Sequence, residues 1–415
     1  MTTTIINKNK KPNVPNSTDK GNVIRNLPNL RFPEFREEWE EHELSEYLDF
    51  KNGLNPKPNQ FGKGIKFISV MDILNNAVIT YDCIRASVSV SEEDMSAFSV
   101  QKGDILFQRS SETLEDVGRA NVYVDDIPAV FGGFVIRGKQ KTNYNPLFFK
   151  YLLSSPLARK RIIRMGAGAQ HFNIGQEGLS KVKLPFACID EQNKIAKILY
   201  LLDKRISLQN KIIEDLKKLK SAIIEIEYTP NAKTTSHIGD VIEQISKRNK
   251  NNAIQNVLSV SNRQGFIKQS DQFENRNVAS EDTSNYKIVE KNDFAFNPAR
   301  INVGSIARLT TLEKGIVSPM YICFRTQENV APEYIDYFFE SKHFYCEIQK
   351  RLEGSVRQCL SFEGLCNIPI SLPSLEMQQR IGKRLLTLGQ KIKTETDLLE
   401  LLNKQKQYLL RQMFI

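Results

Sequence analysis

The chain has 415 residues, 40% of them hydrophobic and 26% charged, which fits a globular protein of two domains rather than a single core, a disordered chain or a fibre. It has no run of about 20 apolar residues and no apolar secretion signal, and its six cysteines and four histidines lack the spacings of a disulfide framework or a zinc site, so we expect a cytoplasmic protein without bound metal. The formal net charge of +10 favours an acidic partner such as a phosphate backbone, and the basic amphipathic helix that would indicate a membrane surface is missing.

Residues 1–28 are rich in Asn, Lys, Thr and Pro and contain few apolar side chains, so we predict a flexible N-terminal tail. Residues 29–186 predict a mixed α/β domain. Within it, residues 102–107 suit a turn of the form Lys-Gly-Asp followed by a short apolar strand. A helix is predicted to begin near Pro146, and the glycine-bearing loop at 166–170 follows it.

A long helix is predicted over residues 187–230. Apolar residues recur there at alternating steps of four and three, which is the spacing of a coiled-coil seam. Two polar residues, Gln209 and Lys220, interrupt this seam, and such interruptions fix the register and the orientation of paired helices. The apolar members of the first seam are Ile195, Leu199, Leu202, Ile206, Ile213 and Leu216.

The second half of the chain repeats the first. Residues 231–374 predict a second mixed domain and residues 375–415 a second long helix. Ile195 aligns with Ile381, and the two helices keep this offset of 186 in sequence number from there onward. The second seam is interrupted at the same two positions, by Glu395 and Lys406. Its apolar members are Ile381, Leu385, Leu388, Ile392, Leu399 and Leu402.

Fainter matches connect the two domains between the helices. The turn at 102–104 corresponds to Lys-Asn-Asp at 291–293, and Val117-Gly118 corresponds to Val303-Gly304. We therefore predict an α+β fold class, in which two pseudo-repeated mixed α/β domains are separated by two long helices that pack as an antiparallel coiled coil. Each seam of about 28 residues would form a rod of roughly 40 Å, which is close to one turn of DNA, roughly 34 to 36 Å.

The order of these segments resembles the specificity subunits of type I restriction-modification systems. Each half contains a variable domain, a Leu-Pro pair and a long helix that begins with a Gln-containing motif. The second helix departs from the first at Met377 and Gly382, where the first has Glu191 and Ala196. The residues that carry the resemblance are Leu30–Phe35, Trp39, Leu184-Pro185, Glu191-Gln192, Ile195-Ala196, Leu372-Pro373 and Met377-Gln378.

The resemblance implies that each variable domain is a target recognition domain that reads one half of a split DNA sequence. The partners that it implies are double-stranded DNA, two methylation subunits, and the restriction subunits that translocate DNA. It also implies a non-catalytic chain without a cofactor of its own, so that S-adenosylmethionine, ATP and Mg are used by the partner subunits. No family-wide base-reading residue can be transferred, because the recognition domains vary.

Recognition of DNA needs phosphate contacts for affinity and base-edge contacts for sequence choice. Arg can bind guanine through two hydrogen bonds, and Gln or Asn can bind adenine in the same way. Arg109 and Arg300 follow matched strands at similar distances, which predicts equivalent places in the two domains. The candidate DNA-binding residues are Arg109, Ser110, Ser111, Arg119 and Gln170 in the first domain and Lys247, Arg248, Lys250, Arg263, Gln264, Arg300, Asn302, Arg357 and Gln358 in the second.

Two alternatives remain open on the sequence alone. The first is an enzyme that modifies DNA by itself, since the residues Asn-Pro-Ala-Arg at 297–300 are faintly similar to the Asn-Pro-Pro-aromatic motif of adenine methyltransferases. Its third and fourth residues differ, and no glycine-rich cofactor loop or P-loop accompanies it. The second is a coiled-coil assembly protein that never contacts DNA, which leaves the net charge unexplained.

Overall fold

The computed structural model describes residues 26–168, 170–230, 236–262, 264–269, 282–354 and 358–415. The chain divides into two compact units, of which unit 1 comprises the residues up to Ser207 together with Leu401–Ile415, and unit 2 comprises Leu208–Glu400. The candidate residues Arg263 and Arg357 lie outside the described residues. No helix in the described parts of the chain is both long enough and apolar enough to cross a membrane.

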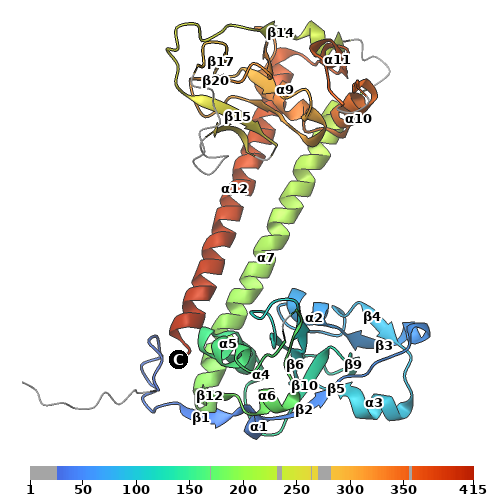
Figure 1. Cartoon of the computed structure of the whole chain (residues 1–415), viewed down its shortest axis with the longest axis vertical. Helices are drawn as coiled ribbons and strands as arrows, with labels where there is room; N and C mark the ends of the chain where they lie inside the picture. Colours follow the sequence, from blue (N-terminus) through green and yellow to red (C-terminus); the bar gives the residue numbers. More distant parts are fainter. Residues whose placement is uncertain (1–25, 169, 231–235, 263, 270–281, 355–357) are drawn as a thin grey trace, which may run out of the picture. The chain divides into compact units, whose positions relative to one another are not determined.

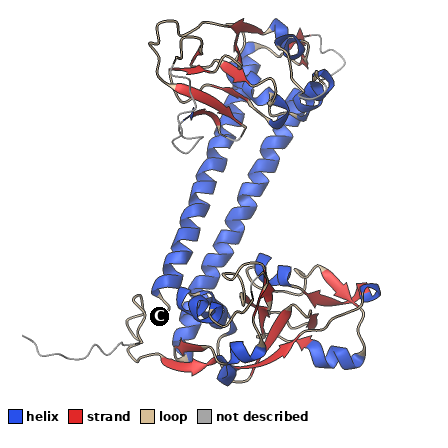
Figure 2. Cartoon of the chain, in the orientation of Figure 1, coloured by secondary structure: helices blue, strands red, loops and turns tan. Residues whose placement is uncertain are grey.

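Unit 1 is built around two four-stranded sheets (Figures 1 and 2). One has the strand order β2-β10-β6-β8 and is antiparallel throughout. The other has the order β4-β3-β9-β5, in which β3 and β9 are parallel. The strands are β1 (Glu40–Glu43), β2 (Leu48–Asn52), β3 (Phe61–Ile68), β4 (Ala86–Val88), β5 (Ser99–Val100), β6 (Ile105–Gln108), β7 (Ser110–Ser111), β8 (Ala120–Val122), β9 (Ala129–Phe131), β10 (Val135–Gln140), β11 (Phe172–Asn173) and β12 (Lys183–Phe186). The helices are α1 (Leu44–Tyr47), α2 (Val70–Asn75), α3 (Glu92–Phe98), α4 (Pro146–Ser154), α5 (Pro156–Ile163) and α6 (Gln176–Ser180), with the 3₁₀ turn η1 (Pro58–Gln60).

Unit 2 contains the same two sheets. Their orders are β14-β21-β18-β19 and β16-β15-β20-β17, and β15 and β20 are the parallel pair. The strands are β13 (Ser236–His237), β14 (Ile242–Ile245), β15 (Val257–Ser261), β16 (Gly265–Lys268), β17 (Lys287–Glu290), β18 (Phe294–Phe296), β19 (Ile306–Arg308), β20 (Lys314–Val317), β21 (Ile322–Thr326) and β22 (Pro369–Ile370). The helices are α9 (Pro332–Phe338), α10 (Lys342–Arg351) and α11 (Phe362–Cys366), with the 3₁₀ turns η2 (Ile238–Asp240) and η3 (Ile301–Val303). The predicted fold class of two pseudo-repeated α/β domains is confirmed.

The repeat holds residue by residue in the strand registers. Ile136 pairs with Phe107 in unit 1, and Ile322 pairs with Phe296 in unit 2. In the parallel pairs, the partner of Phe131 is Ile68, whereas the partner of Val317 is Leu258. The residues of β9, β10, β20 and β21 are thus related by the same offset of 186 that relates the two helices.

The predicted turns before β6 and β18 form for the reason inferred from their residues. Gly103 has a φ of 95° and Asn292 a φ of 71°, and these two residue types tolerate positive φ best. Asp104 accepts the N–H of Gln101 at 3.0 Å, and the carboxylate of Asp293 closes the second turn in the same way. Both turns therefore start their strand at the equivalent place.

Two long helices complete the molecule, α7 (Ile189–Tyr228) and α12 (Leu375–Gln412). The predicted helices span 187–230 and 375–415. Within unit 1, Asp203 in the first half of α7 pairs with Lys406 near the end of α12. Within unit 2, Glu227 near the end of α7 pairs with Arg384 in the first half of α12 (Figure 1). This order is that of an antiparallel helix pair.

Burial along the seam varies with what covers it. Ile195 and Leu199 near the start of α7, and Ile381 and Leu385 near the start of α12, belong to a domain core. Further along each helix, the seam contains both buried and half-buried residues, because two helices alone leave one side of the seam open to solvent. The buried set is Ile195, Leu199, Leu202, Ile213, Ile381, Leu385 and Leu402. The half-buried set is Ile206, Leu216, Leu388, Ile392 and Leu399.

Polar residues inside the seam are paired. The side-chain amide of Gln209, which is 6% exposed, donates to the backbone oxygen of Glu395 at 2.9 Å and also to its carboxylate. These two residues occupy the same position of the repeat, and they contact each other as two antiparallel copies of one helix require. The pair therefore specifies register, as expected for a polar interruption.

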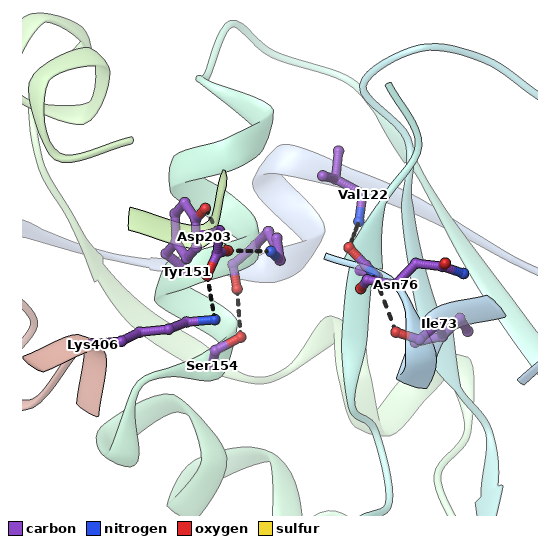
Figure 3. Close-up of polar contacts among 9 residues, drawn as sticks. Ile73, Asn76, Val122, Tyr151, Ser154, Asp203 and Lys406 are labelled. Carbon is purple, nitrogen blue, oxygen red and sulfur yellow. Dashed lines mark hydrogen bonds and ion pairs between the residues drawn. The ribbon is translucent and has the colours of Figure 1, made fainter. Parts of the chain in front are cut away.

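In unit 1, a buried carboxylate joins α4, α7 and α12 (Figure 3). Asp203 accepts the Tyr151 hydroxyl at 2.8 Å, and its oxygens lie 3.2 Å from the Lys150 ammonium and 2.6 Å from that of Lys406. Burial opposes ionisation of Asp203, but the two lysines and the tyrosine outweigh it and hold the pKa of this carboxyl below its usual range. Lys406 thus aligns α12 with α7, as predicted.

Lys220, the counterpart of Lys406 in the repeat, does not pair with α12. Its ammonium lies 2.6 Å from Glu340 in the turn after α9, and 5.0 Å from the centre of the Tyr337 ring. The expectation that this residue aligns the two helices is therefore wrong. In unit 2, the lysine instead ties α7 to the domain, because a carboxylate and an aromatic face are both within reach there.

Candidate nucleic-acid interface

One edge of unit 1 gathers most of its predicted DNA-binding residues. Ser110 and Ser111 form β7, which pairs with β11, the short strand that follows the glycine-bearing loop at 166–170. The N–H of Ile174 donates to the Arg109 oxygen at 2.9 Å and extends this pairing. Gln170 is exposed in the same loop, between the bridged residues Ala167 and Asn173. The structure therefore brings Arg109, Ser110, Ser111 and Gln170 together.

Arg109 lies against the turn that joins β9 to β10. Its backbone N–H donates to the Phe134 oxygen at 2.9 Å, and its guanidinium donates to the Gly133 oxygen at 3.3 Å. The side chain is half-buried, so one part of the guanidinium is held by the turn. A guanidinium held in this way is pre-positioned for a phosphate or a base edge.

Arg119 lies apart from this group. It is paired with Asp116 at 2.6 Å and lines a cavity of about 430 Å³ together with Arg159, Lys150 and Lys406. Burial lowers the pKa of Arg159 to about 10. The side chain of Arg119 therefore faces the surroundings of the Asp203 cluster, and the structure does not place it with Arg109.

In unit 2, a cavity of about 650 Å³ contains one group of candidates. Arg300 is exposed and lines it beside Asn262, and Asn302 is half-buried in η3 next to it. Gln264 is exposed in the turn between β15 and β16. Gln358 is also exposed, and the chain just after it reaches this region, where the N–H of Leu360 donates to the Pro298 oxygen at 3.0 Å.

The basic run at 247–250 lines a different cavity, of about 720 Å³. Lys247, Arg248 and Lys250 are exposed around it, and Lys314 adds a fourth cation. Asn249, which is 2% exposed, braces the loop, because its side-chain amide donates to the Ile254 oxygen at 3.0 Å and its side-chain oxygen accepts the Ile254 N–H at 3.2 Å. No carboxylate lines this cavity among the described residues, so it suits a phosphate.

The predicted equivalence of Arg109 and Arg300 is wrong. Since Phe107 and Phe296 occupy the same register, Arg109 corresponds to Pro298. The backbone agrees, because the oxygens of Arg109 and Pro298 accept from Ile174 and Leu360, which are themselves counterparts in the repeat. Arg300 lies two residues further on, in a connection to the next matched residue that is three residues shorter than in unit 1.

Two functional candidates escaped the sequence analysis, Phe134 and Met320. They are 69% and 62% exposed, and they stand at the same turn of the two units. The signal was available, because the offset that holds from Val117-Gly118 onward also relates Phe134 to Met320. An apolar residue in a turn has neither a charge nor a hydrogen-bonding side chain, so the sequence alone does not indicate it as a DNA contact.

The described residues hold no group of three or more His, Cys, Asp or Glu side chains that could bind a metal ion.

A sequence profile of the family described as "Type I restriction modification DNA specificity domain" matches residues 36–218 and 230–404. The chain belongs to this family. Its two matched segments each contain one mixed domain and most of one long helix, so the two mixed domains are hereafter called the first and second recognition domains.

Comparisons with individual proteins agree with this assignment. The chain is 25% identical to the putative type I restriction enzyme MjaX specificity subunit of Methanocaldococcus jannaschii, across 92% of this chain and 93% of that protein. It is also 25% identical to the type I restriction enzyme MjaVIII specificity subunit of the same organism, across 59% and 62%.

Solved structures share the fold. The S subunit of a type I restriction-modification system from M. genitalium superimposes with a TM-score of 0.60 at 16% identity, and covers 94% of this chain and 99% of that one. A chain from a structure of type I restriction-modification complex assembly gives a TM-score of 0.51 at 14% identity, with coverage of 91% and 98%.

Proposed function

We propose that this specificity subunit reads a bipartite DNA target, with one half-site for each recognition domain, and docks the methylation and restriction subunits of a type I complex. The proposal rests on a contrast between the strands of the two domains, which match, and the residues that follow β6 and β18, which differ. Strand registers match residue by residue, yet the edge that holds Arg109, Ser110 and Ser111 in one domain holds Pro298, Ala299 and Arg300 in the other. Equal scaffolds with unlike edges suit two unlike half-sites.

The exposed groups divide by the kind of contact that they suit. The cations around residues 247–250 have no carboxylate beside them among the described lining residues and suit the phosphate backbone, which gives affinity without sequence choice. Arg109 lies against the turn at Gly133, Arg300 lines the cavity of about 650 Å³, and Gln170 is exposed in its loop. These side chains suit base edges, where Arg selects guanine and Gln selects adenine. Each domain thus supplies candidate groups for sequence choice.

The alternative is a DNA adenine methyltransferase that acts alone. The geometry of Asn297 favours a structural role instead, since its side-chain oxygen accepts the N–H of Ala299 at 3.1 Å and shapes the turn after β18. We propose that the chain is non-catalytic and that S-adenosylmethionine, ATP and Mg are bound by its partners. Methyl transfer by the purified chain in the absence of any partner would favour the alternative.

The test is binding of duplex DNA by the full chain, alone and with its methylation subunits, over a series of salt concentrations. Phosphate contacts release counterions, so we expect the logarithm of the affinity to fall linearly with the logarithm of salt concentration, by about 0.9 for each phosphate contacted. A target-containing duplex should bind more tightly than a scrambled one at every salt concentration. Affinity that is independent of salt and of sequence would favour the coiled-coil assembly protein.

A further inference from the structure

An exposed apolar side chain stands at the same turn of both recognition domains, where the chain passes from one four-stranded sheet to the other. Phe134 lies between β9 and β10, and Met320 lies between β20 and β21. Both turns are closed by a backbone hydrogen bond from the residue after the apolar one to the residue two before it, at 2.8 Å in the first domain and 3.1 Å in the second. The two side chains therefore occupy equivalent places.

The first turn is held firmly, so the exposure of Phe134 does not come from a loose loop. Arg109 donates to two of its oxygens, those of Gly133 and Phe134. Gly132 is buried, and a Cβ atom there would lie 2.6 Å from the ring of the buried Phe67. Because the turn is held by these contacts, the phenyl ring of Phe134, which is 69% exposed, is presented at a defined position on the surface.

The second turn presents Met320 beside hydrogen-bonding groups. Met320 lines the cavity of about 650 Å³ together with Arg300, Asn262 and the exposed Val303. The residue after it, Tyr321, is anchored through its backbone oxygen, which accepts the Lys287 ammonium at 2.6 Å. An apolar projection next to a cation and an amide resembles the chemistry of the first turn, where Phe134 lies next to Arg109.

Single exposed apolar residues are ordinary on a protein surface, but a matched pair calls for a cause. Among the described residues with exposed large apolar side chains, two pairs are related by the offset of the repeat. The pair Ile189 and Leu375 begins the two long helices. The pair Phe134 and Met320 belongs to the recognition domains, and its members differ in shape while both remain apolar.

We propose that Phe134 and Met320 are the wedge residues of the two recognition domains, each inserting at a base step of its own half-site and unstacking it. Phe and Met are among the side chains that act as wedges between base pairs, and the cost of unstacking depends on the step, which adds sequence selection. The flanking Arg109 and Arg300 hold the neighbouring DNA. This inference rests on the proposed function, because it assumes that each domain binds DNA.

The experiment uses the full chain in complex with its methylation subunits and a duplex that carries its methylation-mapped target. The fluorescent adenine analogue 2-aminopurine is placed at successive positions of each half-site, away from the methylated adenine, which the methylation subunit itself would extrude. We expect one base step in each half-site to brighten on binding. Phe134→Ala should abolish the signal in one half-site only, and Met320→Ala in the other only, each with an affinity loss of about tenfold from the lost burial of the side chain.

Matched controls separate this role from general surface effects. Ile127→Ala removes a side chain 53% exposed in the first domain, and Tyr345→Ala one 55% exposed in the second, and both should leave the signals unchanged. Phe134→Leu should keep most of its signal. If the wild-type complex binds its target selectively but no position brightens, or if the alanine variants brighten normally, the wedge is refuted while the proposed function stands. A complex without sequence preference would refute the proposed function itself.

Discussion

At the scale of single residues, Gln192 and Gln378 make equivalent hydrogen bonds in the two halves. Each side-chain oxygen accepts the backbone N–H of a helix N-cap residue, Asn145 at 2.9 Å and Ala331 at 3.0 Å. Each side-chain amide donates to a backbone oxygen just before its own helix, at 2.9 Å in both halves. The glutamine shared by the two sequence motifs is therefore a buried link between the long helix and the domain.

Replacing either glutamine by alanine should destabilise the protein by about 1 to 3 kcal/mol, because a backbone N–H and a backbone C=O, one in a buried and one in a partly buried hydrogen bond, lose their partners. The measurement is urea unfolding followed by circular dichroism. Gln379→Ala is the matched control, since Gln379 is the exposed neighbour of Gln378 and should change the unfolding free energy by less than about 0.5 kcal/mol. Equal effects of Gln378→Ala and Gln379→Ala would contradict the role of the buried amide.

The residue before each glutamine explains where the two motifs differ. Glu191 is fully buried and accepts two hydrogen bonds from Arg31 at 2.8 Å and one from the Trp39 indole at 3.0 Å. The hydrogen bond to Glu191 raises the pKa of Arg31. Met377, in the same position of the second half, packs against an apolar core instead. The carboxylate is thus needed where the N-terminal segment docks.

Two kinds of cation in the second recognition domain should respond differently to substitution. Lys247→Ala or Lys250→Ala should reduce the magnitude of the salt slope of DNA binding by about one while leaving sequence preference intact, as loss of a phosphate contact does. Arg300→Ala should instead cost about 1 to 3 kcal/mol on the target and relax the preference at one position.

The control for these measurements is Lys291→Ala, because Lys291 is already paired with Glu313 at 2.6 Å. Its salt slope should match that of the unaltered chain. A loss of slope equal to that of Lys247→Ala would show that the basic loop has no special place in DNA binding.

At the scale of structural elements, the Asp203 cluster ties three helices of the first unit together. Its lowered pKa means that the ionised carboxylate is favoured by folding. The stabilisation is present above the pKa of the unfolded chain and is lost as the pH falls through the lower pKa of the folded state. Acid should therefore weaken the attachment of α12 to α4 and α7.

Asp203→Asn tests this pH dependence. At pH 7 the variant should unfold at a lower urea concentration, because Lys150 and Lys406 lose their carboxylate and breaking a buried pair costs about 3 to 5 kcal/mol. As the pH falls below the ordinary Asp pKa of about 3.9 and through the lower pKa of folded Asp203, the variant should lose less stability than the unaltered chain. Parallel losses in the two proteins would contradict this sign, and Asp215→Asn, an exposed position on α7, should behave like the unaltered chain.

The elements that were predictable are those fixed by local rules or by the repeat. The offset of 186 that holds from Val117 onward predicts the later strands and the helices, and the Gly103 and Asn292 turns follow from the tolerance of these residues for positive φ. The residues that follow β6 and β18, which hold the candidate DNA contacts, were not predictable in the same way. Nine residues separate Phe107 from Val117, but six separate Phe296 from Val303, so the offset between the halves changes within this segment and the sequence alone does not show where. The partner of Lys220 was also hidden, because it depends on tertiary packing of the turn after α9.

At the scale of the whole molecule, the two long helices are proposed to set the spacing of the half-sites. Inserting three heptads at matched points next to Gln209 and Glu395 would lengthen both helices by about 32 Å at about 1.5 Å per residue. That is close to one DNA turn, so the same groove face should be presented. We expect the unspecified spacer of the target to grow by about ten base pairs, with both halves unchanged. Methylation mapping measures it, and an unchanged spacer would show that the helices do not set the distance.

The central claim is that two recognition domains on one scaffold read two separate half-sites. Methylation mapping of genomic DNA from cells that carry this chain and its partner subunits tests it most directly, compared with cells that carry Arg300→Ala. The account predicts a target of two specified halves with an unspecified stretch between them, and a variant that relaxes one half alone. A single continuous target, or a variant that alters both halves equally, would contradict it.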